Sequence, residues 1–114
     1  MTLKLTYQQA EALFNLFNEM VLLSDAASLD QKLVMLHMGS IYKKLRNKWE
    51  GAAKGTYRLT VTEPEATAYR IYWRDNDLSH SPYEWNMIIS HCGQIDREIN
   101  THVLYQHSKL KFLK

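Results

Sequence analysis

Two short stretches of alternating apolar and polar residues divide the chain into two similar halves. Residues 2–6 and residues 57–61 alternate in this way, which predicts two half-buried β-strands. Thr6 and Thr62 stand at the ends of these stretches, and a glutamine or glutamate follows each threonine three residues later. This is the spacing of a capping box, in which two side chains satisfy backbone amides at the start of a helix. The pattern therefore predicts a strand followed directly by a helix, twice.

Apolar residues that recur at intervals of three and four predict four amphipathic helices. We expect these helices to cover residues 7–23, 29–49, 63–77 and 82–106. Ser28 and Ser81 precede the second and fourth helices with the same capping-box spacing. The tail beyond residue 106 alternates weakly, so a third strand and a frayed terminus are both consistent with it.

The two halves of the chain also resemble each other residue by residue. A shift of 56 positions aligns Leu3 with Leu59, and a shift of 54 positions aligns His37 with His91. Around these histidines both halves carry histidine, glycine, isoleucine, a basic residue and an aliphatic residue at alternate positions. Chance similarity between amphipathic helices is the alternative explanation, but it does not account for the matching strand-to-helix junctions.

We therefore predict a single helix-dominated α+β domain over residues 1–114. It consists of two strand-helix-helix repeats, at residues 2–50 and 57–114, related by a pseudo-twofold axis. Four helices and a small antiparallel sheet of two or three strands result, because such units bury their apolar faces most simply against each other. Gly39 and Gly93 are expected where the two long helices cross closely, since glycine inside a helix costs about 1 kcal/mol relative to alanine.

Length and composition agree with one globular domain and restrict its cellular setting. The chain has 114 residues, of which 46% are hydrophobic and 23% are charged, as is usual for a domain with one core. No segment approaches the roughly 18 consecutive apolar residues of a membrane-spanning helix. The first residues lack the pattern of a secretion signal. We therefore expect a cytoplasmic protein without a membrane partner.

One cysteine and two histidines are the first candidates for chemistry. Cys92 is the only cysteine, which excludes an intrachain disulfide, and its place on an apolar stripe predicts an inert core thiol. The pseudo-twofold could bring His37 and His91 together, but a zinc site needs three or four ligands. No histidine or carboxylate lies four residues from either one. We therefore expect both histidines to be structural, with no metal and no cofactor.

Large aromatic and arginine side chains are concentrated between residues 69 and 85. Tyr69 and Trp73 occupy positions that the first half fills with apolar residues, so we expect them in the core. The other members are not required for a core, and tyrosine and arginine are enriched in protein interfaces. The interface candidates, on the exposed side of the third helix and the following turn, are Arg70, Tyr72, Arg74 and Tyr83.

Cations are unevenly spread, although the formal net charge is only +2. One group, a candidate for nucleic-acid binding, comprises Lys43, Lys44, Arg46, Lys48, Lys54 and Arg58. A second group near the end of the chain comprises Lys109, Lys111 and Lys114. Part of the first group also suits the negative end of the second helix dipole, which is a purely structural explanation.

Three hypotheses for function follow. The leading one is a protein-protein interaction or adaptor module, including the case of a homodimer, because the sequence contains no phosphate-binding loop, nucleophile elbow or zinc-hydrolase motif. The second is a nucleic-acid accessory protein that uses the basic cluster and the lysine-rich tail. The third is a small metal-binding protein or enzyme that uses His37 and His91. We favour a protein without enzymatic activity.

Overall fold

The computed structural model describes residues 1–51, 55–76, 78 and 80–112, with side chains described over 1–49, 55–76, 78 and 80–99. It is a helix-dominated α+β fold with four helices and a two-stranded antiparallel sheet. The elements are β1 (Thr2–Leu5), α1 (Tyr7–Leu16), a π-helical turn η1 (Phe17–Val21), α2 (Leu29–Gly51), β2 (Tyr57–Thr60), α3 (Glu63–Asp75) and α4 (Pro82–Phe112). The predicted helices and the first two strands are therefore present, with ends that differ by a few residues.

The sheet pairs β1 with β2 so that Leu3 lies opposite Leu59 and Lys4 lies opposite Arg58. The apolar residues of both strands are buried, while the two cations are exposed on the other face. This is the alternation that the sequence predicts for half-buried strands. Val61 extends the pairing, because its amide donates to the Met1 carbonyl at 2.9 Å.

Capping boxes connect both strands to the helices that follow them. The Oγ1 atom of Thr6 accepts a hydrogen bond from the Gln9 amide at 3.1 Å, and the Thr6 amide donates to the Gln9 side chain at 3.0 Å. Thr62 and Glu65 repeat the arrangement, at 3.2 and 2.8 Å. Both predicted junctions are confirmed.

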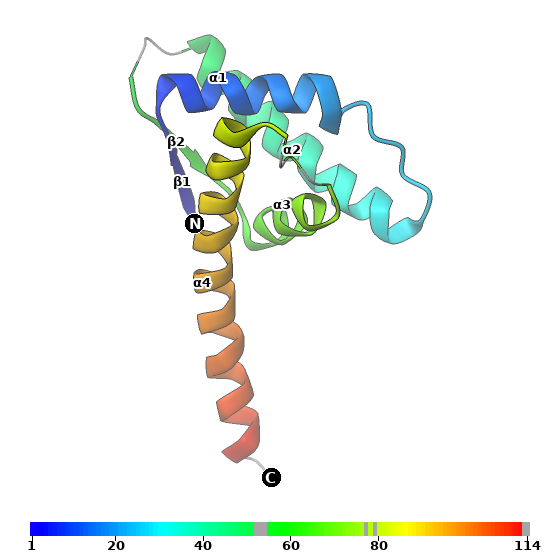
Figure 1. Cartoon of the computed structure of the whole chain (residues 1–114). Helices are drawn as coiled ribbons and strands as arrows, with labels where there is room; N and C mark the ends of the chain where they lie inside the picture. The colour runs from blue at the N-terminus through cyan, green and yellow to red at the C-terminus, as the bar shows by residue number, and fades with distance from the viewer. Residues whose placement is uncertain (52–54, 77, 79, 113–114) are drawn as a thin grey trace.

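The core lies between the sheet and the inner faces of the four helices. Its largest fully buried side chains include Phe17 of η1, Met38 of α2, and Tyr69 and Trp73 of α3. α3 packs against both α2 and α4 (Figure 1). α4 passes beside β1, where the Gln94 side chain donates to the Thr2 carbonyl at 2.8 Å. Beyond that contact α4 extends past the rest of the molecule (Figure 1).

Of the alternatives for the tail and the sheet, the described residues show two strands, and α4 remains helical to Phe112. One expectation about backbone structure is wrong. The helical glycines do not mark a close crossing: a Cβ on Gly39 would meet no described atom within 4 Å outside its own helix backbone. At Gly93 the nearest atom, at 3.7 Å, belongs to Arg97 of the same helix. We have no packing reason for either glycine.

No helix in the described part of the chain is both long enough and apolar enough to span a membrane.

Candidate functional site

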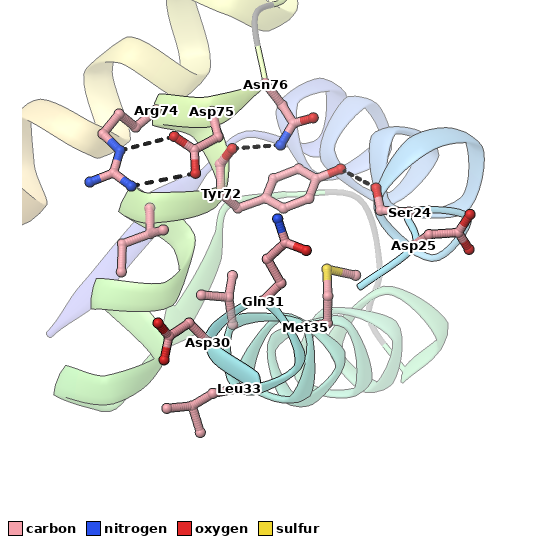
Figure 2. Close-up of a pocket in the computed structure, with 12 residues that line it drawn as sticks. Ser24, Asp25, Asp30, Gln31, Leu33, Met35, Tyr72, Arg74, Asp75 and Asn76 are labelled. Carbon is pink, nitrogen blue, oxygen red and sulfur yellow. Dashed lines mark hydrogen bonds and ion pairs between the residues drawn. The ribbon is translucent and has the colours of Figure 1, made fainter. Parts of the chain in front are cut away.

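A pocket of about 570 Å³ opens where the start of α2 faces the end of α3 (Figure 2). Three separate segments line it. Ser24 and Asp25 come from the connection between η1 and α2. The first turns of α2 and the last turns of α3 with the residue after it supply the rest: Asp30, Gln31, Leu33, Val34 and Met35, and Ile71, Tyr72, Arg74, Asp75 and Asn76. Val34, Met35 and Ile71 belong to the apolar part of the lining, which also includes charged groups.

Tyr72 separates this pocket from the core. Its hydroxyl lies 2.7 Å from Oγ of Ser24 (Figure 2), and its ring meets the Trp73 ring edge-on, with centroids 4.9 Å apart. Burial raises the pKa of the Tyr72 phenol. Only 5% of the residue is exposed, so the expectation that Tyr72 is a surface residue is wrong. The cause is the connection after η1, which covers a side chain 48 positions later in the sequence.

Carboxylates stand around the rim of the pocket on different sides, at Asp25, Asp30 and Asp75 (Figure 2). Asp75 is paired with Arg74 at 3.0 Å, and the hydrogen bond from that guanidinium lowers the pKa of the Asp75 carboxyl. Asp25 and Asp30 are exposed, and no described cation is paired with either of them. Arg74 is the only cationic residue among the described residues of the lining, which is therefore acidic.

The pocket continues along the two helices into a second hollow of about 390 Å³. The two hollows share Leu33, Val34 and Ile71, and the second one extends past His37 to Glu63 at the start of α3. We call the combined depression the α2–α3 groove. Since it runs from Glu63 to Asn76, it follows the whole of α3, which is about 20 Å long at 1.5 Å per residue.

Three exposed leucines lie at the start of α2, and one of them, Leu33, lines this groove. Leu29, Leu33 and Leu36 of α2 are 82%, 56% and 69% exposed. Leu29 and Leu36 precede the buried residues Met38 and Leu45 by nine positions each, which is two and a half helical turns and therefore the opposite side of the helix. We call Leu29, Leu33 and Leu36 the leucine face. In the sequence these three leucines fit the apolar stripe of the second helix, but they lie away from the core.

The other interface candidates divide between two surfaces. Arg70 forms an ion pair with Asp96 at 2.9 Å and, with Arg74, lines a hollow of about 440 Å³ between α3 and α4. Tyr83, in the first turn of α4, is 49% exposed. Arg74 lines this hollow and the pocket beside Tyr72. The four predicted residues thus do not form one patch.

The basic cluster is also divided. Lys43 and Arg46 are exposed on one flank of α2, while Lys44 and Lys48 lie on the other, because residues three or four apart share a side of a helix. Arg58 is exposed on β2, opposite Lys4. Lys54 and the side chains of Lys109, Lys111 and Lys114 lie outside the part of the chain that is described.

Lys44 forms an ion pair within the molecule, with Glu65. Its ammonium lies 2.6 Å from the Glu65 carboxylate, which also accepts from Oγ of Ser40 at 2.6 Å. Burial alone would raise the pKa of Glu65, but the hydrogen bonds from Lys44, Ser40 and the Thr62 amide outweigh it and lower that pKa to about 2. The cluster joins the middle of α2 to the first turn of α3. The capping box predicted Glu65, but no sequence signal indicated Ser40 or Lys44.

The two histidines have different surroundings. His91 is buried, with Nδ1 2.9 Å from the Tyr69 hydroxyl, and burial lowers its pKa to about 4. His37 is half-buried and lines the α2–α3 groove. Among the described residues, no group of three histidine, cysteine or acidic side chains is placed to hold a metal ion. Burial raises the pKa of the Cys92 thiol, as expected for a core residue.

Comparison with known proteins adds no relative: no family model, no curated protein and no solved structure matches the chain.

Proposed function

We propose that this protein functions by binding another protein through the leucine face of α2 and the adjoining α2–α3 groove. One observation carries the proposal. Of the seven large hydrophobic residues that are exposed among the described side chains, five lie between residues 22 and 36. These five are Leu22, Leu23, Leu29, Leu33 and Leu36, and the other two are Tyr83 and Ile89.

The concentration matters because single exposed leucines are ordinary, whereas a contiguous apolar area beside a groove is typical of an interaction site. Burying one leucine side chain completely contributes roughly 1.5–3 kcal/mol. Leu29 and Leu36 retain most of their surface in the isolated chain, so their burial by a partner would supply much of a micromolar affinity. Aspartates and Arg74 at the edge of the pocket provide the polar border that interfaces usually have.

The alternative hypothesis of nucleic-acid binding has less support. Lys43 and Lys48 are exposed and could approach phosphates, but Lys44 neutralises Glu65. The two flanks of α2 also face different directions, whereas a nucleic-acid site usually presents one basic surface. A salt-dependent affinity for single-stranded RNA or DNA, lost when Lys43 and Lys48 are replaced by alanine, would favour this alternative over the leading proposal.

We also infer that the fold arose from two copies of one strand-helix-helix unit. The register of the sheet supports this, since Leu3 pairs with Leu59, its equivalent under the shift of 56 positions. A twofold axis between these two residues would exchange β1 with β2 and one capping box with the other. The exchange of α1 with α3 and of α2 with α4 is the remaining requirement. An experimental structure in which one rotation does not perform both exchanges would exclude the pseudo-twofold.

The interaction proposal is tested with a variant in which Leu29, Leu33 and Leu36 are all replaced by glutamine. The matched control replaces Tyr83 and Ile89, which are exposed elsewhere, by glutamine. Because all five side chains are exposed, both variants should retain helical circular dichroism and a stability within about 0.5 kcal/mol of the original. Each protein is immobilised and exposed to lysate of its own source, and the retained proteins are identified.

The expected result is a defined partner, or the protein itself, retained by the original and by the control but lost from the leucine variant. Retention of the same set on all three surfaces would mean that the leucine face does not bind protein, and the proposal would fail.

A further inference from the structure

The α2–α3 groove has a charge that restricts what can occupy it. Four carboxylates, Asp25, Asp30, Glu63 and Asp75, line its two hollows, and Arg74 is the only arginine or lysine that does so. Four negative charges and one positive charge give the lining a formal charge of −3. All four carboxylates are exposed and could meet an approaching cation.

Between these carboxylates the groove is apolar. Val34 and Met35 of α2 and Ala68 and Ile71 of α3 form its sides, with the Tyr72 ring at one end. An apolar depression of helical length between two helices suits an amphipathic helix that inserts one face. An acidic border requires cations along the edges of that inserted face. About 13 residues of helix would match the 20 Å length of the groove.

The chain itself contains such a segment at its C-terminal end. Residues 99–114 include no aspartate or glutamate and carry Lys109, Lys111 and Lys114, a formal charge of +3 from these lysines. In a helix, Ile99, Val103 and Leu110 share one side because they are four and seven positions apart, and Lys109 and Lys111 fall on the two opposite edges of that side. The structure continues α4 as a helix through residue 112.

This segment does not reach the groove of its own chain. The C-terminal end of α4 extends away from the body of the molecule, whereas the groove lies beside the start of α2 (Figure 1). A second copy can supply the segment, and a twofold axis would then fill both grooves at once, which gives a closed dimer.

We propose that the α2–α3 groove binds the basic C-terminal segment of a second copy of this chain, in a reciprocal dimer held by apolar contact and by lysine-carboxylate pairs. This inference rests on the proposed interaction function and names its partner. The leucine face includes Leu33, which lines the groove, and would become part of the same interface.

Charge reversal tests the proposal in the full-length chain. The tail variant replaces Lys109, Lys111 and Lys114 by glutamate, and the groove variant replaces Asp25, Asp30 and Asp75 by lysine. A matched control makes the same charge change elsewhere, with Lys43, Lys48 and Arg58 replaced by glutamate. Sedimentation velocity over a concentration series measures self-association, and circular dichroism checks the fold.

We expect the original chain and the control to dimerise, and each reversed variant to dimerise at least about tenfold more weakly, since several exposed ion pairs become repulsive. A chain that carries both reversals restores the opposite charges and should dimerise again. Raising the salt concentration should weaken the original dimer. If dimerisation returns in the doubly reversed chain, damage to folding cannot be the reason that the single reversals weaken it.

Two outcomes overturn the inference. One is an original chain that stays monomeric at high micromolar concentration. The other is a dimer that survives the tail reversal. Neither outcome overturns the interaction function by itself, because a different protein lost on replacement of the leucine face would still support it. Equal retention of partners by the leucine variant would contradict both the interaction function and the reciprocal dimer that rests on it.

Discussion

The hydroxyl of Tyr69 lies 2.9 Å from Nδ1 of His91, with the tyrosine 1% and the histidine 5% exposed. The pair joins α3 to α4 inside the core. Burial lowers the pKa of His91 to about 4 and raises that of Tyr69 well above its usual value, so both side chains are neutral near pH 7. This neutral hydrogen bond is a structural link between the two helices.

The first prediction concerns acid stability. Above pH 6.5, His91 is neutral in both folded and unfolded chains and has no effect on the pH dependence. Below pH 6.5 the unfolded chain takes up a proton that the folded chain resists until about pH 4, so the free energy of unfolding should fall by up to about 3 kcal/mol over this interval. Urea unfolding at a series of pH values measures this fall in the free energy of unfolding.

His91→Gln supplies the control for this prediction. Glutamine can still bond to the Tyr69 hydroxyl but does not titrate, so the slope between pH 6.5 and 4.5 should flatten even if the variant is less stable overall. An unchanged slope would show that other groups cause the acid sensitivity.

The second prediction concerns Glu65. Replacement by alanine removes the cap of α3 and the contacts to Ser40 and Lys44, and should cost about 2 kcal/mol of unfolding free energy. Gln9→Ala, at the equivalent position of α1, is the matched control and should cost less, because Gln9 is bonded only to Thr6 among the described contacts. Equal losses in urea unfolding would mean that the α2 contacts contribute nothing.

Glu65 also gives a second acid transition. Its folded pKa of about 2 lies below the ordinary value of 4.5, so its stabilising contribution is complete above pH 4.5 and is lost as the pH falls toward 2. Lys44→Met removes the strongest hydrogen bond to the carboxylate and should therefore move this loss to higher pH. An acid limb that is unchanged in Lys44→Met would contradict the assigned role of the lysine.

Local sequence signals were sufficient for much of the fold. Thr6, Thr62 and Ser28 all accept a hydrogen bond from the amide three residues later, as their spacing indicates. Strand alternation also predicts the buried and exposed sides of both strands, because each strand has one face on the core. These features depend on neighbours within four residues, which is why a single sequence is enough to predict them.

The candidate site was predicted poorly because it depends on distant segments. Periodicity could not show that the connection after η1 covers Tyr72, or that Lys44 and Ser40 meet Glu65. Periodicity was also misleading at the start of α2, where Leu29, Leu33 and Leu36 fit an apolar stripe but lie opposite the core. The apolar stripe of α2 is too wide for one face of a helix. This width is the sequence signal that could have identified a second apolar surface.

The last prediction concerns the contact that holds the edge of the pocket. Ser24 is joined both to the Met20 carbonyl at 2.9 Å and to the Tyr72 hydroxyl at 2.7 Å, so it anchors the connection between η1 and α2 against α3. Tyr72→Phe removes one hydroxyl while keeping the ring against Trp73, and should cost about 1 kcal/mol of unfolding free energy. Ser24→Ala should cost a similar amount, and the double variant should cost less than the sum because the two side chains share one bond.

Amide hydrogen exchange distinguishes anchoring from simple loss of stability. In both single variants the amides of residues 22–28 should exchange faster, by more than the change in global stability explains, while amides in the middle of α3 should follow global stability alone. This connection leads directly into α2 and carries the exposed Leu22 and Leu23. Loosening it should therefore also weaken the binding of any partner to the leucine face. Additive costs in the double variant, or exchange that changes equally in both regions, would show that the bond between Ser24 and Tyr72 does not hold the pocket in place.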